Sequence, residues 1–218
     1  MDLNQRVLLI RHGETAWSSS RRHTGRSDIP LTDDGREQAD RLRGRLPLRD
    51  FGLVLTSPLT RSAETARRAG LVVDDTSDDL VEWDYGEAEG RTTEEMRGEI
   101  PGWSVWTNRL ARGETIEQVG ARADRVIARL RAHDGLCVLF AHAHILRILA
   151  ARWCELPPDA GRALMLDPAS LSILGHERET PVIERWNMVP IGATERFIGT
   201  PEPTATLSAV SADSSTTS

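Results

Sequence analysis

Three short, largely apolar runs constrain the fold of this chain more than any other feature. They cover residues 7–10, 51–56 and 136–140, and each is followed by a segment with helical features. A short, continuously apolar run is typical of a strand that is buried on both faces of a sheet. Strands that alternate with helices in this way predict an α/β three-layer sandwich, with a mostly parallel central sheet and helices on both faces.

The other segments extend this pattern. Two pairs, Thr92 with Glu95 and Thr115 with Gln118, have capping-box spacing, and the second opens a predicted helix over residues 116–130. Extended structure is predicted over residues 71–73, 171–174 and 182–186. We expect one domain over residues 1–198, in which residues 80–113 form an irregular insertion over a cleft. Residues 199–218 contain almost no large apolar side chain and are expected to form a disordered tail.

Charge and composition argue against several classes of partner. The net charge of −6 disfavours broad attraction to nucleic acid or to an anionic membrane. No apolar run is long enough for a signal peptide or a transmembrane helix. Cys137 and Cys154 belong to no paired metal or redox motif, which favours a reducing compartment. We therefore expect a cytoplasmic protein, and leave open whether it is a monomer or a homodimer.

The polar residues that follow the three runs carry the candidate chemistry. Arg11 and His12 end the first run, Arg61 follows the second, and His142 follows the third. Ligands of open α/β sheets bind beyond the carboxyl ends of the strands, so these side chains should meet at one edge. Arginine donors match phosphate oxygens, and a histidine nitrogen can attack phosphorus to form a phosphohistidine. Glu82 is the candidate proton donor to the leaving group, and we expect its aromatic neighbours to raise its pKa.

The pair His142 and His144 also raises the alternative of a zinc site. No Asp, Glu or Cys nearby completes a set of ligands, so we expect no metal and no cofactor. Trp103 and Trp106 lie in the predicted insertion, where they either wall the cleft or anchor the segment.

Five motifs resemble those of the histidine phosphatase superfamily, also called the phosphoglycerate-mutase-like family, over roughly residues 6–187. They lie at residues 9–15 (LIRHGET), 23–35, 57–66, 82–90 (EWDYGEAEG) and 140–142 (FAH). The resemblance implies that His12 is the nucleophile and Glu82 the proton donor, with a phosphate pocket formed by Arg11, Arg61 and His142. It also implies that Thr24 and Gly25 lie in a segment that contacts the rest of the substrate.

Two positions depart from the family pattern. Ala143 stands where many members have glycine, and its methyl group is expected to restrict the backbone beside the phosphate. Ser18 stands where the mutases commonly have asparagine, so the resemblance does not imply the hydrogen bond from that asparagine to the phosphate.

The distance between two motifs separates the candidate activities. About 60 residues lie between Glu82 and His142, and residues 103–109 lack the paired arginines that glycolytic mutases use for the substrate carboxylate. We therefore favour a phosphomonoesterase, similar to actinobacterial acid phosphatases and fungal sugar-bisphosphate phosphatases. Its partner would be a small phosphomonoester of the sugar phosphate or phosphoglycerate class, hydrolysed through a phosphohistidine. A phosphoglycerate mutase is the alternative, and a non-catalytic phosphate-binding protein is less favoured because all five pocket residues are present.

Overall fold

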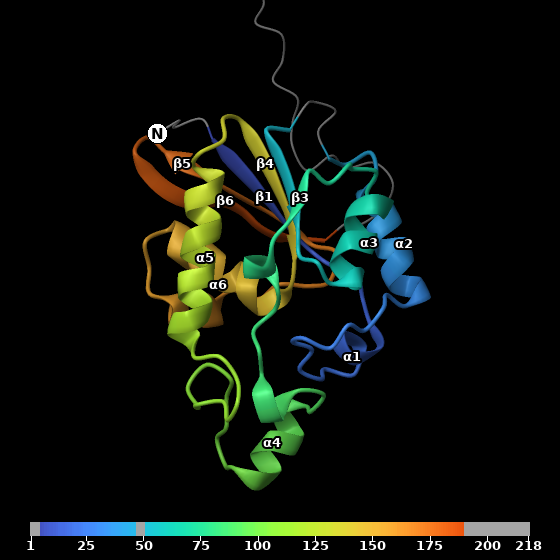
Figure 1. The fold of residues 1–218 in the computed structure, drawn as a ribbon, viewed down its shortest axis with the longest axis vertical. Helices are drawn as coiled ribbons and strands as arrows, with labels where there is room; N and C mark the ends of the chain where they lie inside the picture. The colour runs from blue at the N-terminus through green and yellow to red at the C-terminus, as the bar shows by residue number, and fades with distance from the viewer. Residues whose placement is uncertain (1–4, 47–50, 190–218) are drawn as a thin grey trace, which may run out of the picture.

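The computed structural model describes residues 5–46 and 51–189, which are built around a six-stranded sheet with the order β3-β2-β4-β1-β5-β6 (Figure 1). The strands are β1 (Arg6–Arg11), β2 (Leu53–Thr56), β3 (Asp75–Thr76), β4 (Leu136–Ala141), β5 (Leu171–Glu177) and β6 (Thr180–Met188). Strands β1 to β4 are parallel, and β5 and β6 form an antiparallel hairpin beside β1. The predicted α/β fold with a mostly parallel sheet is confirmed.

Helices cover both faces of this sheet (Figure 1). Helices α5 (Ile116–Leu130) and α6 (Ala143–Trp153) pack on one face, and α2 (Asp33–Leu42) and α3 (Thr60–Arg68) on the other. Successive side chains of a strand point to opposite faces, so the apolar residues of β1 divide between two clusters, one under each pair of helices. Burial on both faces is the reason that β1 and β4 are apolar at successive positions.

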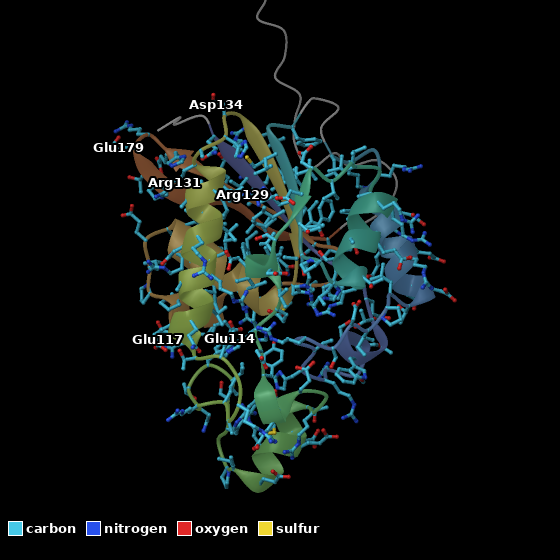
Figure 2. All side chains as sticks on the ribbon, in the orientation of Figure 1. Glu114, Glu117, Arg129, Arg131, Asp134 and Glu179 are labelled. Atoms are coloured by element: carbon cyan, nitrogen blue, oxygen red, sulfur yellow. The ribbon has the colours of Figure 1, made fainter. Side chains whose placement is uncertain are left out.

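The predicted capping boxes begin two helices. Thr115 accepts a hydrogen bond from the Gln118 amide at 3.3 Å, and the Gln118 side chain accepts one from the Thr115 amide at 2.8 Å. The same arrangement of Thr92 and Glu95 opens α4 (Thr93–Glu99). Figure 2 shows Glu117 near the start of α5 and Arg129 near its end. A negative charge at the start and a positive charge at the end both interact favourably with the helix dipole.

One predicted extended segment lies elsewhere. Residues 71–73 do not pair with a strand, and β3 instead begins at Asp75. Asp74 starts the pairing, because its backbone donates to the Val54 carbonyl at 3.0 Å and its carboxylate accepts from the Val54 amide at 2.7 Å. Leu71 and Val73 pack against the apolar cluster before that point, so burial and not pairing accounts for their apolar character.

The segment predicted as an insertion lies beyond the carboxyl ends of the parallel strands, together with α1 (Ala16–Ser19) (Figure 1). Between residues 78 and 113 it contains α4 and two short 3-10 helices, η1 (Asp78–Leu80) and η2 (Gly86–Ala88). A third, η3 (Pro158–Ala163), follows α6. The predicted tail over residues 199–218 lies outside the described residues. Within residues 5–46 and 51–189, no helix has the length and apolar character needed to cross a bilayer.

Candidate active site

A cleft of about 270 Å³ opens at the carboxyl ends of β1 and β4. Arg11 and His12 reach it from the end of β1, and Ala143 and His144 reach it from the first turn of α6. Glu82 enters from the segment after η1. The parallel strands thus bring together residues that lie more than 130 positions apart in the sequence, as expected from the fold.

The backbone selects the protonation state of His12. Its Nδ1 lies 2.7 Å from the carbonyl oxygen of Gly13, which can only accept, so Nδ1 carries the proton. Burial, followed by the charges of Arg61 and Arg11, holds the pKa of His12 well below its usual value. The ring is therefore neutral at neutral pH, and Nε2 keeps the lone pair that a nucleophile needs.

Arg11, the residue before this histidine, has one N–H donor without a partner in the described part of the chain. Its Nη1 donates to the Leu166 carbonyl at 2.6 Å, which fixes the guanidinium. Its Nε is buried and has no hydrogen-bond partner among the described residues. A buried, charged donor without a partner is costly unless an acceptor binds there, and phosphate oxygens are suitable acceptors.

Arg61 and His142 lie behind His12 and not along the cleft. The His142 ring centroid is 5.1 Å from that of His12, and Arg61 Nε donates to His142 Nδ1 at 3.1 Å. The other ring nitrogen, Nε2, therefore carries the proton and donates to Ser57 Oγ at 2.8 Å. Burial and the Arg61 charge lower the pKa of His142, so this ring is also neutral.

The remaining donors of Arg61 are also used by the protein. Its Nη1 donates to the Ser27 carbonyl at 2.8 Å, and its Nη2 donates to the Gly25 carbonyl at 2.9 Å. Of the three residues expected in the phosphate pocket, Arg11 lines the cleft, and Arg61 and His142 are buried behind His12. The loop over residues 24–27 turns its carbonyls onto Arg61, which explains the difference.

Glu82 is held as a carboxylate by backbone amides. Its Oε1 accepts from the amides of Trp83 at 3.0 Å and Ile145 at 2.9 Å, and its Oε2 accepts from the amide of His144 at 3.0 Å. Burial acts to raise the pKa of Glu82, but the side chain of His144, and then its backbone amide, outweigh burial and hold the pKa well below the usual value. The expectation that aromatic neighbours raise this pKa is therefore wrong. The amides at the start of α6 favour the ionised form.

His144 joins Glu82 to the aromatic wall of the cleft. Its Nδ1 lies 2.7 Å from the Tyr85 hydroxyl and 3.8 Å from Glu82 Oε2. Burial lowers the pKa of His144, and the hydrogen bond and charge of Glu82 act against that shift. No group of three or more His, Cys, Asp or Glu suited to a metal ion occurs in the described part of the chain.

Thr24 and Gly25 have different positions. Thr24 lines the cleft, and its hydroxyl donates to the Arg22 carbonyl at 3.0 Å. Gly25 is buried away from the cleft, and its amide donates to both carboxylate oxygens of Glu89, at 2.9 and 3.0 Å. A Cβ at Gly25 would lie 2.5 Å from the Trp83 carbonyl, so a glycine is required for this close approach.

Ser18 and Ala143 both line the cleft. The Ser18 hydroxyl accepts from the Thr15 amide at 2.9 Å and donates to the Thr15 carbonyl at 3.1 Å, which closes the capping box of α1. Ala143 is the first residue of α6 and has no positive φ. Its methyl group therefore causes no backbone strain, contrary to the restriction expected for an alanine in place of glycine.

Several residues of the site were not identified from the sequence. Ser57 accepts from His142, and Arg21 and Arg147 line the cleft. One signal was available, because Arg147 follows His144 by three positions on a helix and so lies on the same face.

Trp103 and Trp106 anchor the segment behind the cleft. The Trp103 ring lies 5.3 Å from that of His23, and the Trp106 ring lies 5.0 Å from that of His144. Both tryptophans therefore support side chains that line the cleft, and neither is among its lining residues in the described structure.

Comparisons with known proteins agree with this geometry. The family model of the histidine phosphatase superfamily (branch 1) matches residues 7–189. An acid phosphatase from Mycobacterium tuberculosis is 44% identical over 179 residues, which cover 80% of this chain and 88% of the relative. Sedoheptulose 1,7-bisphosphatase from Saccharomyces cerevisiae is 36% identical and covers 69% of this chain and 68% of its own. A probable phosphoglycerate mutase from an Enterobacter species is 29% identical, over 83% of this chain and 89% of the relative.

Solved structures give the same result. The product of an open reading frame of Mycobacterium tuberculosis superposes with a TM-score of 0.81 at 38% identity, covering 86% of this chain and all of the other. A mycobacterial glucosyl-3-phosphoglycerate phosphatase superposes with a TM-score of 0.73 at 29% identity, covering 84% of this chain and 98% of the other. The sheet order, the histidine at the end of β1 and these similarities lead to one conclusion: the chain is an enzyme of the histidine phosphatase superfamily, branch 1.

Proposed function

We propose that this enzyme is a phosphomonoesterase that hydrolyses a small sugar phosphate or phosphoglycerate through a phosphohistidine at His12. The observation that carries the proposal is the protonation of His12, whose Nδ1 proton is bound by the Gly13 carbonyl so that Nε2 is free to attack. Arg11 lines the same cleft as His12, where its positive charge favours a phosphate group. The phosphatases among the relatives support the same activity.

The reaction has two steps. Nε2 of His12 forms a bond to phosphorus as the bond between phosphorus and the leaving oxygen breaks, and Glu82 donates a proton to that oxygen. A water molecule then attacks phosphorus as its bond to Nε2 of His12 breaks, and gives a proton to Glu82. This proton leaves with the released phosphate, which restores neutral His12 and ionised Glu82. Because Glu82 is ionised in the resting protein, the proton would enter with the monoanionic form of the substrate, whose second pKa is about 6.

A phosphoglycerate mutase is the second candidate, because probable mutases are among the relatives at 28–30% identity. The two activities differ in the acceptor of the phosphoryl group, which is water in a phosphatase and a substrate hydroxyl in a mutase. Phosphate release measured beside isomer exchange, with 3-phosphoglycerate as substrate, separates them directly.

The proposal is tested by phosphate release from a panel of phosphomonoesters, combined with acid quenching of the enzyme during turnover of a labelled substrate. We expect an acid-labile, base-stable label on the wild-type protein and its absence from His12→Ala, which should lose essentially all turnover. His133→Ala, outside the cleft, is the matched control and should keep both label and turnover. Label on serine, cysteine or aspartate would refute the mechanism.

A further inference from the structure

The cleft contains more positive charge than one transferred phosphate requires. Four arginines line it (Arg11, Arg21, Arg22 and Arg147), whereas Glu82 is the one acidic residue in its described lining. Arg11 lies at the His12 end, and Arg22 is already bound to the Gly90 carbonyl at 2.7 Å and to Glu95 at 3.1 Å. Arg21 and Arg147 are the two remaining arginines of the cleft lining, and neither forms an ion pair with a carboxylate within the described residues.

Arg147 is fixed in place by groups that carry no negative charge. Its Nε donates to the Gly161 carbonyl at 3.1 Å and its Nη2 to the Arg162 carbonyl at 2.9 Å. Its guanidinium carbon lies 4.6 Å from the centre of the Trp106 ring, a cation–π contact. Nη1 forms no hydrogen bond among the described residues, and the side chain lines the cleft. The protein thus holds a half-buried cation in one orientation with no carboxylate paired to it within the described structure, which is a preorganised anion site.

Arg21 occupies a strained backbone position. Its φ is 57°, in the left-handed region that favours glycine, and it is the second residue after the end of α1. Its amide donates to the Ser18 carbonyl at 3.2 Å, but its exposed side chain lines the cleft and forms no hydrogen bond or ion pair within the described residues, so no side-chain contact offsets this conformation. Backbone strain beside a cleft is typical of a residue whose side chain has a role in binding.

We propose that Arg147 and Arg21 form a second anion subsite, which binds a phosphate or carboxylate of the substrate that is not transferred. The subsite rests on the proposed phosphomonoesterase activity and narrows its substrate class to molecules with two anionic groups. His144 lies three positions before Arg147 on α6 and lines the same cleft as Glu82 and Arg147.

The test compares substrates that differ in one anionic group. Fructose 1,6-bisphosphate is compared with fructose 6-phosphate and fructose 1-phosphate, and 3-phosphoglycerate with glycerol 3-phosphate, which has a hydroxymethyl group in place of the carboxylate. We expect kcat/KM to be about 10- to 100-fold higher for the two-anion member of at least one set, as two charge-assisted hydrogen bonds would give. The set that shows the preference distinguishes a second phosphate from a carboxylate.

Two variants locate the preference. Arg147→Met should lose most of it, and Arg147→Lys, which keeps the charge without the fixed fork, should recover a part. Arg21→Gly should also reduce the preference while its Tm is no lower than that of the wild type, because glycine relieves the strain. Arg178→Gly is the matched control, since Arg178 has a φ of 55° and is exposed in the β5–β6 turn, away from the cleft.

The outcomes separate this proposal from the proposed function. Equal kcat/KM within each set, with p-nitrophenyl phosphate still hydrolysed, would overturn the subsite and leave the phosphatase intact. Equal losses on one-anion and two-anion substrates in Arg147→Met and Arg21→Gly would also overturn it, because the arginines would then act only as general attraction. Absence of phosphate release from every substrate, p-nitrophenyl phosphate included, would refute the proposed function itself.

Discussion

At the residue scale, backbone groups decide the protonation of the candidate catalytic side chains. One carbonyl, that of Gly13, places the proton of His12 on Nδ1, and three amides stabilise the charge of Glu82. The same residue types in other surroundings would titrate differently, since burial alone lowers the pKa of a histidine and raises that of a carboxyl group. The proposed nucleophile is thus neutral at neutral pH, whereas the proposed acid must first receive a proton.

Glu82→Gln is expected to affect substrates according to their leaving group. A sugar alkoxide needs a proton in the transition state, and p-nitrophenolate departs with little help, so kcat/KM should fall about 10²- to 10⁴-fold for the first and much less for the second. The ratio of the two losses is the measurement. The side-chain amide of the variant would also disturb the site, because it faces three backbone amides, but this disturbance affects both substrates alike. Equal losses would assign Glu82 a structural role and make Asp84 the next candidate for the donor.

The pH profile should be acid-shifted. The lowered pKa of Glu82 keeps it ionised in the free enzyme, and the lowered pKa of His12 keeps it neutral, so the missing proton must come with the substrate. For an alkyl phosphate, kcat/KM should rise as pH falls from 8 through about 6, where the monoanion forms, and should decline only at a pH low enough to protonate His12. A kcat/KM that increases between pH 6 and 8 would contradict this assignment.

At the element scale, α5 positions the segment that carries Glu82. Nε and Nη2 of Arg122 each donate to the Glu114 carboxylate at 2.8 Å, and its Nη1 donates to the Val81 carbonyl at 2.7 Å. Glu114 in turn accepts from the amide of Asp84 at 3.0 Å, on the other side of Glu82. Figure 2 shows Glu114 just before the start of α5, so one ion pair joins this helix to both ends of the segment over residues 81–84.

Arg122→Met is therefore expected to reduce both stability and turnover. It leaves the Glu114 carboxylate partly buried without its partner, and the free energy of unfolding should fall by about 3 kcal/mol. Arg125→Met, one turn-length further along α5, removes a more exposed pair with Asp79 and should cost less than about 1 kcal/mol. Chemical denaturation measures both. Similar, small losses in the two variants would mean that the Arg122–Glu114 pair does not hold the segment.

At the scale of the whole molecule, the charge of the cleft is opposite to that of the protein. The chain has a net charge of −6, yet arginines outnumber acids in the lining of the cleft. Such a cleft concentrates anionic substrates against the overall repulsion. Fixed guanidinium groups would also supply the positive charge that a metal ion provides in other phosphatases.

Activity should consequently survive treatment with EDTA. The expected kcat/KM of the chelated and dialysed enzyme equals that of the untreated one, and added zinc or magnesium should bring no increase. Loss of activity on chelation, followed by recovery with one of these metals, would instead revive the alternative that His142 and His144 begin a metal site.

The sequence by itself determined the order of strands and helices and the residues that end each parallel strand. Apolar runs, capping pairs such as Thr115 with Gln118, and the sheet-edge rule depend on neighbours along the chain, so they can be read from it directly. Family motifs added the candidate roles of His12 and Glu82. The start of β3 was missed because Leu71 and Val73 are apolar for packing and not for pairing.

Only the tertiary structure decided the electrostatics and the direction of the side chains. The Glu82 carboxylate meets the His144 side chain and amides of α6, all more than 60 positions away, and these contacts reverse the direction expected for its pKa. Arg61 is turned inward by carbonyls of residues 24–27, more than 30 positions earlier in the chain. A pKa and a rotamer depend on whatever groups packing brings within a few ångströms, and no local pattern in a single sequence records those distances.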